Sequence, residues 1–99
     1  MIKRRNLTVA GITSTLVSPG HRNAYCLGRR FMIERRSVRT VGASTSFIDY
    51  VVTERNPVDN TFLKDIERSD GSLNRTVAAA HALIASVIID AAVAARTIS

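Results

Sequence analysis

The sequence predicts an α+β protein in which an antiparallel β-sheet meander precedes one C-terminal helix or two. In the first two thirds, Thr, Val, Ile, Phe and Tyr form short runs broken by turn residues, which is typical of strands. After Gly71 the apolar spacing becomes helical and stays so. Strands that are not interleaved with helices argue against βαβ units. At 99 residues, we expect a single domain over 1–99.

The sheet is expected over about residues 5–67. We predict strands at Leu7–Ala10, Thr13–Ser18, Tyr25–Arg36, Ser46–Arg55 and Thr61–Glu67. Turns are predicted at 18–20, where Pro precedes Gly, and at 56–59, where Pro lies between Asx residues. In the third run, Phe31 and Ile33 alternate with Arg30, Glu34 and Arg36, so we expect one apolar and one charged side.

The helical segment is expected over about residues 72–96, with Asp70 or Ser72 as its N-cap. Nine of the residues from 77 to 95 are Ala, which favours helix. A β-branched run follows Ser86, so one bent helix or two helices both remain open.

Apolar residues cover most of the helix circumference after position 86, and one sheet cannot cover two sides of a helix. We therefore expect a homodimer. The predicted dimer interface consists of Val77, Leu83, Ile84, Val87 and Ile88.

No residue grouping suggests catalysis. His21 lies in a turn, and His81 lies among Ala and Leu, where we expect a packed helix residue rather than a base. Cys26 is the single thiol, expected in the core or an interface. We therefore predict no enzyme, no catalytic residues, no metal, no cofactor and no small-molecule substrate. We expect no secretory signal and no membrane span, because His81, Ser86 and Asp90 interrupt the apolar C-terminal stretch.

Charge is distributed unevenly along this basic chain, whose net charge is +6. Residues 1–40 hold nine Lys or Arg and one acid, whereas residues 41–99 hold five and seven. This asymmetry predicts a polyanion-binding region on the strands, although a solvated basic surface would show the same pattern. Arg donates to phosphate, and Thr and Asp hydrogen-bond the edges of unpaired bases. The predicted RNA-binding residues are Arg30, Glu34, Arg36, Asp49, Thr53, Arg55, Asp59 and Thr61.

The C-terminal third resembles the coat proteins of single-stranded RNA bacteriophages (leviviruses), particularly the Q-beta-like branch. Residues 59–62 (DNTF) look like that family's last strand, after Asn56-Pro57. Residues 69–91, from Ser-Asp through Arg-Thr to Ile-Ile-Asp-Ala, look like its two C-terminal helices. Two departures are a short loop at 56–60 and Pro57 in place of a base-stacking aromatic residue.

The resemblance implies a viral capsid protein that forms intertwined homodimers. The strands of two subunits would join into one sheet, and each helix would lie across the partner's sheet. Dimers would assemble into an icosahedral shell, a virus-like particle, whose inner sheet face binds genomic RNA. That face would include an operator hairpin site, with Asp59 as a contact, and binding there would repress replicase translation. The protein would be located in the virion, and in the host cytoplasm during assembly.

Two other functions fit the same residues. One is a small dimeric nucleic-acid-binding regulator. The other is a non-enzymatic interaction or decoration subunit of another assembly, in which the basic strands bind an acidic protein.

Overall fold

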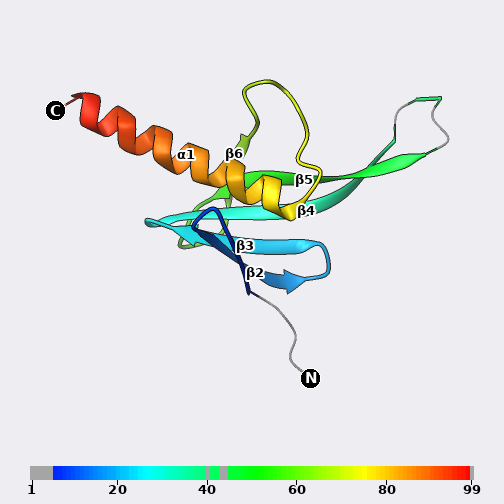
Figure 1. Cartoon of the computed structure of the whole chain (residues 1–99). Helices are drawn as coiled ribbons and strands as arrows, with labels where there is room; N and C mark the ends of the chain where they lie inside the picture. Colours follow the sequence, from blue (N-terminus) through cyan, green and yellow to red (C-terminus); the bar gives the residue numbers. More distant parts are fainter. Residues whose placement is uncertain (1–5, 40, 43–44, 99) are drawn as a thin grey trace.

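The chain forms a curled antiparallel sheet with a helix across one face, which confirms the α+β class (Figure 1). The computed structural model describes residues 6–39, 41–42 and 45–98. The elements are β1 (Asn6–Val9), β2 (Ile12–Ser18), β3 (His21–Cys26), β4 (Arg29–Arg39), β5 (Ser46–Arg55), β6 (Phe62–Ile66) and α1 (Val77–Ile98). The six strands pair in chain order, as expected for a meander. β1 and β6 are therefore the edge strands of the described sheet.

Three of the hairpins turn within two residues, and two of these turns have positive φ at both positions. Ala10 and Gly11 join β1 to β2, and Leu27 and Gly28 join β3 to β4, all four with positive φ. This is the backbone geometry of the type I′ turn, whose twist matches that of paired strands. Gly adopts it without steric cost, whereas Leu27 does so at φ 51°.

The Leu27-Gly28 turn overturns one prediction. The run Tyr25–Arg36 was expected to be one strand, but the turn divides it between the end of β3 and the start of β4. Residues 21–24, which were not assigned to a strand, form β3 together with Tyr25 and Cys26. Leu-Gly is not among the usual turn dipeptides, so the sequence pattern did not predict a turn within this apolar run.

The core lies between the sheet and the first half of α1. Phe31, Ile33 and Val52 project from neighbouring strands and are fully buried. Ala80 and Ile84 meet them from α1 and are also fully buried. The small Ala80 side chain lets the helix backbone approach the sheet closely.

One continuous helix follows the sheet, so neither a break nor a second helix occurs in the part of the chain that the structure describes. The helix begins at Val77, later than predicted, because Thr76 Oγ1 accepts a hydrogen bond from the Ala79 amide at 3.0 Å and caps it. Asp70 instead accepts hydrogen bonds from Ser72 in the preceding turn. The Ser86 hydroxyl donates to Leu83 O at 2.8 Å, which leaves the helix continuous at that residue.

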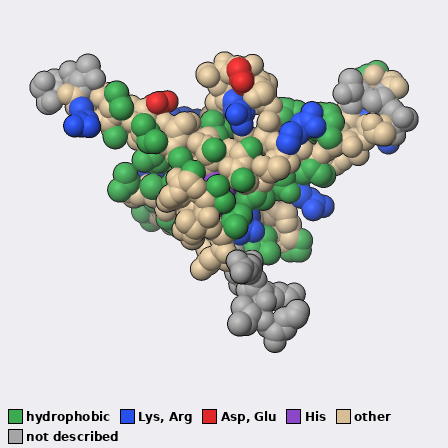
Figure 2. All heavy atoms as spheres, in the orientation of Figure 1, with side chains coloured by type: hydrophobic (Ala, Val, Ile, Leu, Met, Phe, Trp, Pro, Cys, Tyr) green, Lys and Arg blue, Asp and Glu red, His purple; other side chains and the backbone are tan. Residues whose placement is uncertain are grey.

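The second half of α1 projects beyond the sheet (Figure 1). Hydrophobic side chains line the helix toward its C-terminal end in Figure 2, and Ile89 and Val93 are more than half exposed. The stretch Val77–Arg96 is long and apolar enough to cross a membrane, with mean hydropathy 2.0. One such helix is weak evidence for a membrane span, since apolar helices of soluble proteins meet the same criteria.

Candidate nucleic-acid interface

The two faces of the sheet differ in chemistry. We call the face under α1 the covered face and the opposite one the open face. Phe31 and Ile33 lie on the covered face and are buried, so Arg30, Glu34 and Arg36 project from the open face, as the alternation predicted. β4 thus contributes apolar side chains to the core on one side and carries cations on the other.

The register of β4 and β5 brings most of the predicted RNA-binding residues together. Arg30 lies opposite Arg55, Met32 opposite Thr53, Glu34 opposite Val51, and Arg36 opposite Asp49. Residues directly opposite one another share a face. Six of the eight predicted residues therefore share the open face: Arg30, Glu34, Arg36, Asp49, Thr53 and Arg55.

Asp49 is nevertheless unavailable to a ligand. Asn74 extends the sheet past β6, with its carbonyl accepting from the Tyr50 amide at 2.8 Å. Its own amide donates to Asp49 Oδ1 at 3.1 Å, and Arg36 donates to Asp49 Oδ2 at 3.4 Å. The Asp49 carboxylate is consequently buried and anchors the segment that leads into α1.

Asp59 and Thr61 lie outside the strands, in the loop between β5 and β6. Asp59 Oδ1 accepts from the Thr61 amide at 3.0 Å and from the Thr61 hydroxyl at 2.7 Å. These hydrogen bonds lower the pKa of Asp59 below its usual value, the hydroxyl bond contributing most. The two residues stabilise the loop, and they are not part of the cationic cluster on β4 and β5.

A row of four side chains crosses the open face. Tyr25 on β3 lies opposite Arg30, Arg30 opposite Arg55, and Arg55 opposite Phe62 on β6. The Arg30 guanidinium carbon lies 5.2 Å from the centroid of the Tyr25 ring, and that of Arg55 lies 5.7 Å from the Phe62 centroid. We call these four residues the aromatic–arginine row.

Sequence reasoning missed both rings of this row. Tyr25 was assigned to the same strand as Arg30, and finding them opposite each other requires the turn at 27–28. Phe62 faces Arg55 because the register shifts between β5 and β6 at Glu54 and Arg55. Such an irregularity changes the direction in which a side chain projects, and no short sequence pattern predicts it.

The electrostatics of the row are unusual. Like charges directly opposite each other on a sheet are destabilising, yet Arg30 and Arg55 face one another. Neither makes an ion pair with an acid in the part of the chain that the structure describes. Arg55 Nε donates to Thr53 Oγ1 at 3.2 Å, while Arg30 Nε is buried without a hydrogen-bond partner among the described residues.

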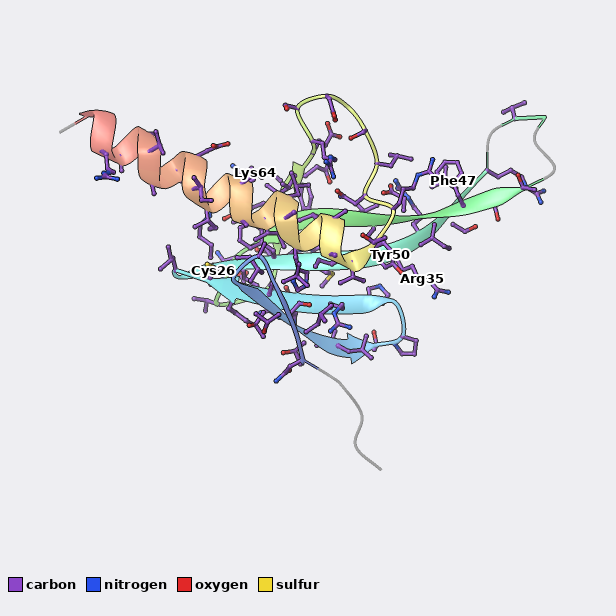
Figure 3. The ribbon with its side chains drawn as sticks, in the orientation of Figure 1. Cys26, Arg35, Phe47, Tyr50 and Lys64 are labelled. Carbon is purple, nitrogen blue, oxygen red and sulfur yellow. The ribbon has the colours of Figure 1, made fainter. Side chains whose placement is uncertain are left out.

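Arg29 shows the contrast on the covered face. It makes a bidentate salt bridge with Glu54, in which Arg29 Nε donates to Oε2 at 2.8 Å and Nη2 donates to Oε1 at 2.7 Å. The hydrogen bond from Arg29 holds the pKa of Glu54 below its usual value. Lys64, labelled in Figure 3, lies 3.9 Å from the same carboxylate. Acids thus neutralise a cation on the covered face but leave the central pair of the open face uncompensated.

The two histidines and the cysteine make contacts within the fold. His81 is fully buried as predicted, between Ser14 and the Ile12 carbonyl. His21 lies 3.6 Å from Glu34, so that acid is partly engaged on the open face. Cys26 (Figure 3) is half-buried and packs against the core. Among the described residues, no three His, Cys, Asp or Glu side chains lie together as metal ligands would.

The predicted dimer-interface residues lie mostly in the interior of the single chain. Leu83 and Ile84 are buried in its core, and Val87 and Ile88 are partly buried against it. Val77 borders a small cavity beside Arg35 and Tyr50, which lie together near the start of α1 in Figure 3. The apolar helix surface left uncovered is instead formed by residues such as Ile89 and Val93.

Comparisons with protein-family models, curated proteins and solved structures return no match to this chain.

Proposed function

We propose that the chain is a coat protein of a single-stranded RNA bacteriophage, which binds genomic RNA through the open face of its sheet. The observation that carries this proposal is the uncompensated arginine pair between two exposed aromatic rings. Arginine provides charge and paired donors for phosphate, and exposed rings provide stacking surfaces for unpaired bases. The resemblance of residues 56–91 to levivirus coat proteins supports the same function.

The second part of the proposal is assembly through homodimers. The uncovered apolar surface of α1 would be buried by a second subunit, and the edge strand β6 would pair with its copy. Dimers would then close into an icosahedral shell with the open face inward. In this proposal the protein resides in the virion, and in the host cytoplasm during assembly, where the open face also binds an operator hairpin and represses replicase translation.

Electron microscopy of the protein expressed alone in bacteria tests the proposal, with the ratio of absorbance at 260 and 280 nm measured on the same chromatographic peak. Closed particles that contain RNA are expected. A dimer that binds RNA but never forms particles would contradict the coat function and favour the nucleic-acid-binding regulator. Particles or dimers without nucleic acid would contradict the RNA-binding assignment.

A further inference from the structure

The aromatic–arginine row has the features of a ligand site rather than of a stabilising surface. Its two cations repel each other, and Arg30 Nε is shielded from water without gaining a hydrogen bond from the described residues. Each of these features raises the free energy of the unliganded fold. A bound anion between the guanidinium groups would offset the repulsion between the two cations.

The rings at the ends of the row define which anion fits. Tyr25 is 57% exposed and Phe62 is 54% exposed, although both are large and apolar. Each ring has a guanidinium over one face, which stiffens the pair into a platform. A planar heterocycle can stack on such a platform, whereas a simple phosphate or sulfate would leave both rings exposed to water.

The spacing of the row fits two nucleotides. Neighbouring strands lie about 4.8 Å apart, so Tyr25 and Phe62 are separated by roughly 14 Å across three strand intervals. The two arginines occupy the middle of that span. A phosphate held at the centre would leave its two flanking bases splayed toward opposite ends, one toward each ring.

We propose that the aromatic–arginine row is a subsite for a two-nucleotide step of unpaired RNA. Arg30 and Arg55 donate to the shared phosphate, and the flanking bases stack at Tyr25 and Phe62. This proposal rests on RNA binding by the open face and specifies how it occurs. Every base has a flat face, so the subsite tolerates any sequence but excludes bases held in a duplex.

Binding measurements on the full-length protein test the subsite. The probes are a fluorescent oligouridine, which has no stable secondary structure, and an RNA duplex with the same number of phosphates. Fluorescence anisotropy should show tighter binding of the oligouridine. The Tyr25→Ala and Phe62→Ala substitutions should each weaken oligouridine binding by about tenfold and leave duplex binding unchanged. The ring-retaining variants Tyr25→Phe and Phe62→Tyr should bind as the parent does.

The salt dependence separates charge from stacking. On a single strand, removing one interaction with a phosphate lowers the slope of log K against log salt by about 0.7. The double variant Arg30→Ala/Arg55→Ala should lower that slope, whereas the two ring variants should lower affinity at an unchanged slope. Arg39→Ala removes one arginine charge from the exposed end of β4, outside the row. Val17→Ala removes exposed apolar surface from β2. Both controls should change the affinity for oligouridine by less than the two ring variants and the double arginine variant do.

Tyrosine fluorescence provides a direct signal from one ring. The chain has two tyrosines and no tryptophan, so a Tyr50→Phe variant leaves Tyr25 as its sole strong emitter. Oligouridine should quench that emission by stacking, and the duplex should not.

The outcomes distinguish the subsite from the proposed function. RNA binding that depends on Arg30 and Arg55 but not on the rings would overturn the stacking subsite and leave RNA binding by the open face intact. Binding that is insensitive to all four residues would overturn the row as the site. If no RNA is bound under any salt condition, both the subsite and the proposed function fail.

Discussion

The covered and open faces of the sheet are made by the same strands and differ in what their alternate residues contribute. On the covered face, Phe31, Ile33 and Val52 are buried, and the polar groups beside them have partners. On the open face, Arg30 and Arg55 are adjacent cations without an acidic partner among the described residues. The difference indicates that stability is concentrated on one face, which leaves the other free to carry binding groups at some cost in stability.

The largest expected effect comes from the core. Ile84→Ala should lower the free energy of unfolding by about 2–5 kcal/mol, because Ile84 is fully buried. Ile89→Ala makes the same change on the exposed side of α1 and should cost the isolated chain far less. Urea denaturation followed by circular dichroism measures both. A loss below about 0.5 kcal/mol for Ile84→Ala, as for an ordinary surface substitution, would show that α1 does not dock through the Ile84 side.

The polar contact between α1 and β2 should produce the next effect. Ile12 O can only accept, so His81 Nδ1 carries the proton and donates to it at 3.0 Å. Nε2 then accepts from the Ser14 hydroxyl at 2.7 Å, while Arg22 Nε donates to Ser14 Oγ at 2.8 Å. Ser14→Ala should cost about 1–3 kcal/mol, because it leaves buried polar groups without a partner. The same denaturation curves measure the loss.

The protonation of His81 makes this contact sensitive to acid. Burial lowers the pKa of His81 below its ordinary 6.5, and the nearby Arg22 charge acts in the same direction. The unfolded chain therefore binds the proton more readily, and stability should fall as the pH drops below about 6.5. Urea midpoints between pH 8 and pH 5 should show the loss. It should persist in His21→Asn, and its persistence in His81→Gln would exclude His81 as the cause.

The paired cation on the covered face should give a smaller change. Glu54→Gln removes the charge that binds Arg29 and should cost about 1–2 kcal/mol at neutral pH. The pKa of Glu54 lies below its ordinary 4.5, so this contribution is present above that value and is lost as the pH falls through the lowered one. The free energies of unfolding of the variant and the parent should therefore become equal at acid pH. If the two free energies of unfolding differ by the same amount at every pH down to the lowest one measured, the loss comes from packing and not from charge.

The smallest effect is expected on the open face. Replacing both Arg30 and Arg55 with Ala removes a repulsion and an unsatisfied donor, but it also removes two cation–π contacts and the hydrogen bond to Thr53. These terms offset one another, so the free energy of unfolding should change by less than about 0.5 kcal/mol. Thermal and urea denaturation without RNA measure it. A loss comparable with that of Glu54→Gln would show that the row stabilises the fold, and the contrast between the two faces would disappear.

Much of the local structure could be predicted because its signals are local. Ser46–Arg55 forms a strand with the predicted bounds, since its β-branched and aromatic residues and the Asn56-Pro57 turn define it. His81 was correctly expected to pack within the helix. The helix start was misplaced, because Asp70, Ser72 and Thr76 are all competent caps. The hydrogen bonds of Asn74 with Tyr50 and Asp49 hold residue 74 at the sheet, so the helix begins after it.

The candidate site was predicted only in part. Alternation placed Arg30 and Arg55 on the same face, but it could not show that they are directly opposite each other. Asp49 was expected to contact RNA, yet Asn74, a residue distant in sequence, binds its carboxylate. Tyr25 and Phe62 were missed because a turn and a register shift bring them into the row.

The sequence by itself determined the order of elements, the uneven charge and the division of β4 and β5 into apolar and polar sides. These follow from composition and from the two-residue period of a strand, which each segment carries without its neighbours. Tertiary structure decided which side chains are neighbours across strands, which acids are buried, and which half of α1 is covered. Those properties depend on register and on the docking of α1, because a shift of one residue would change every cross-strand pair.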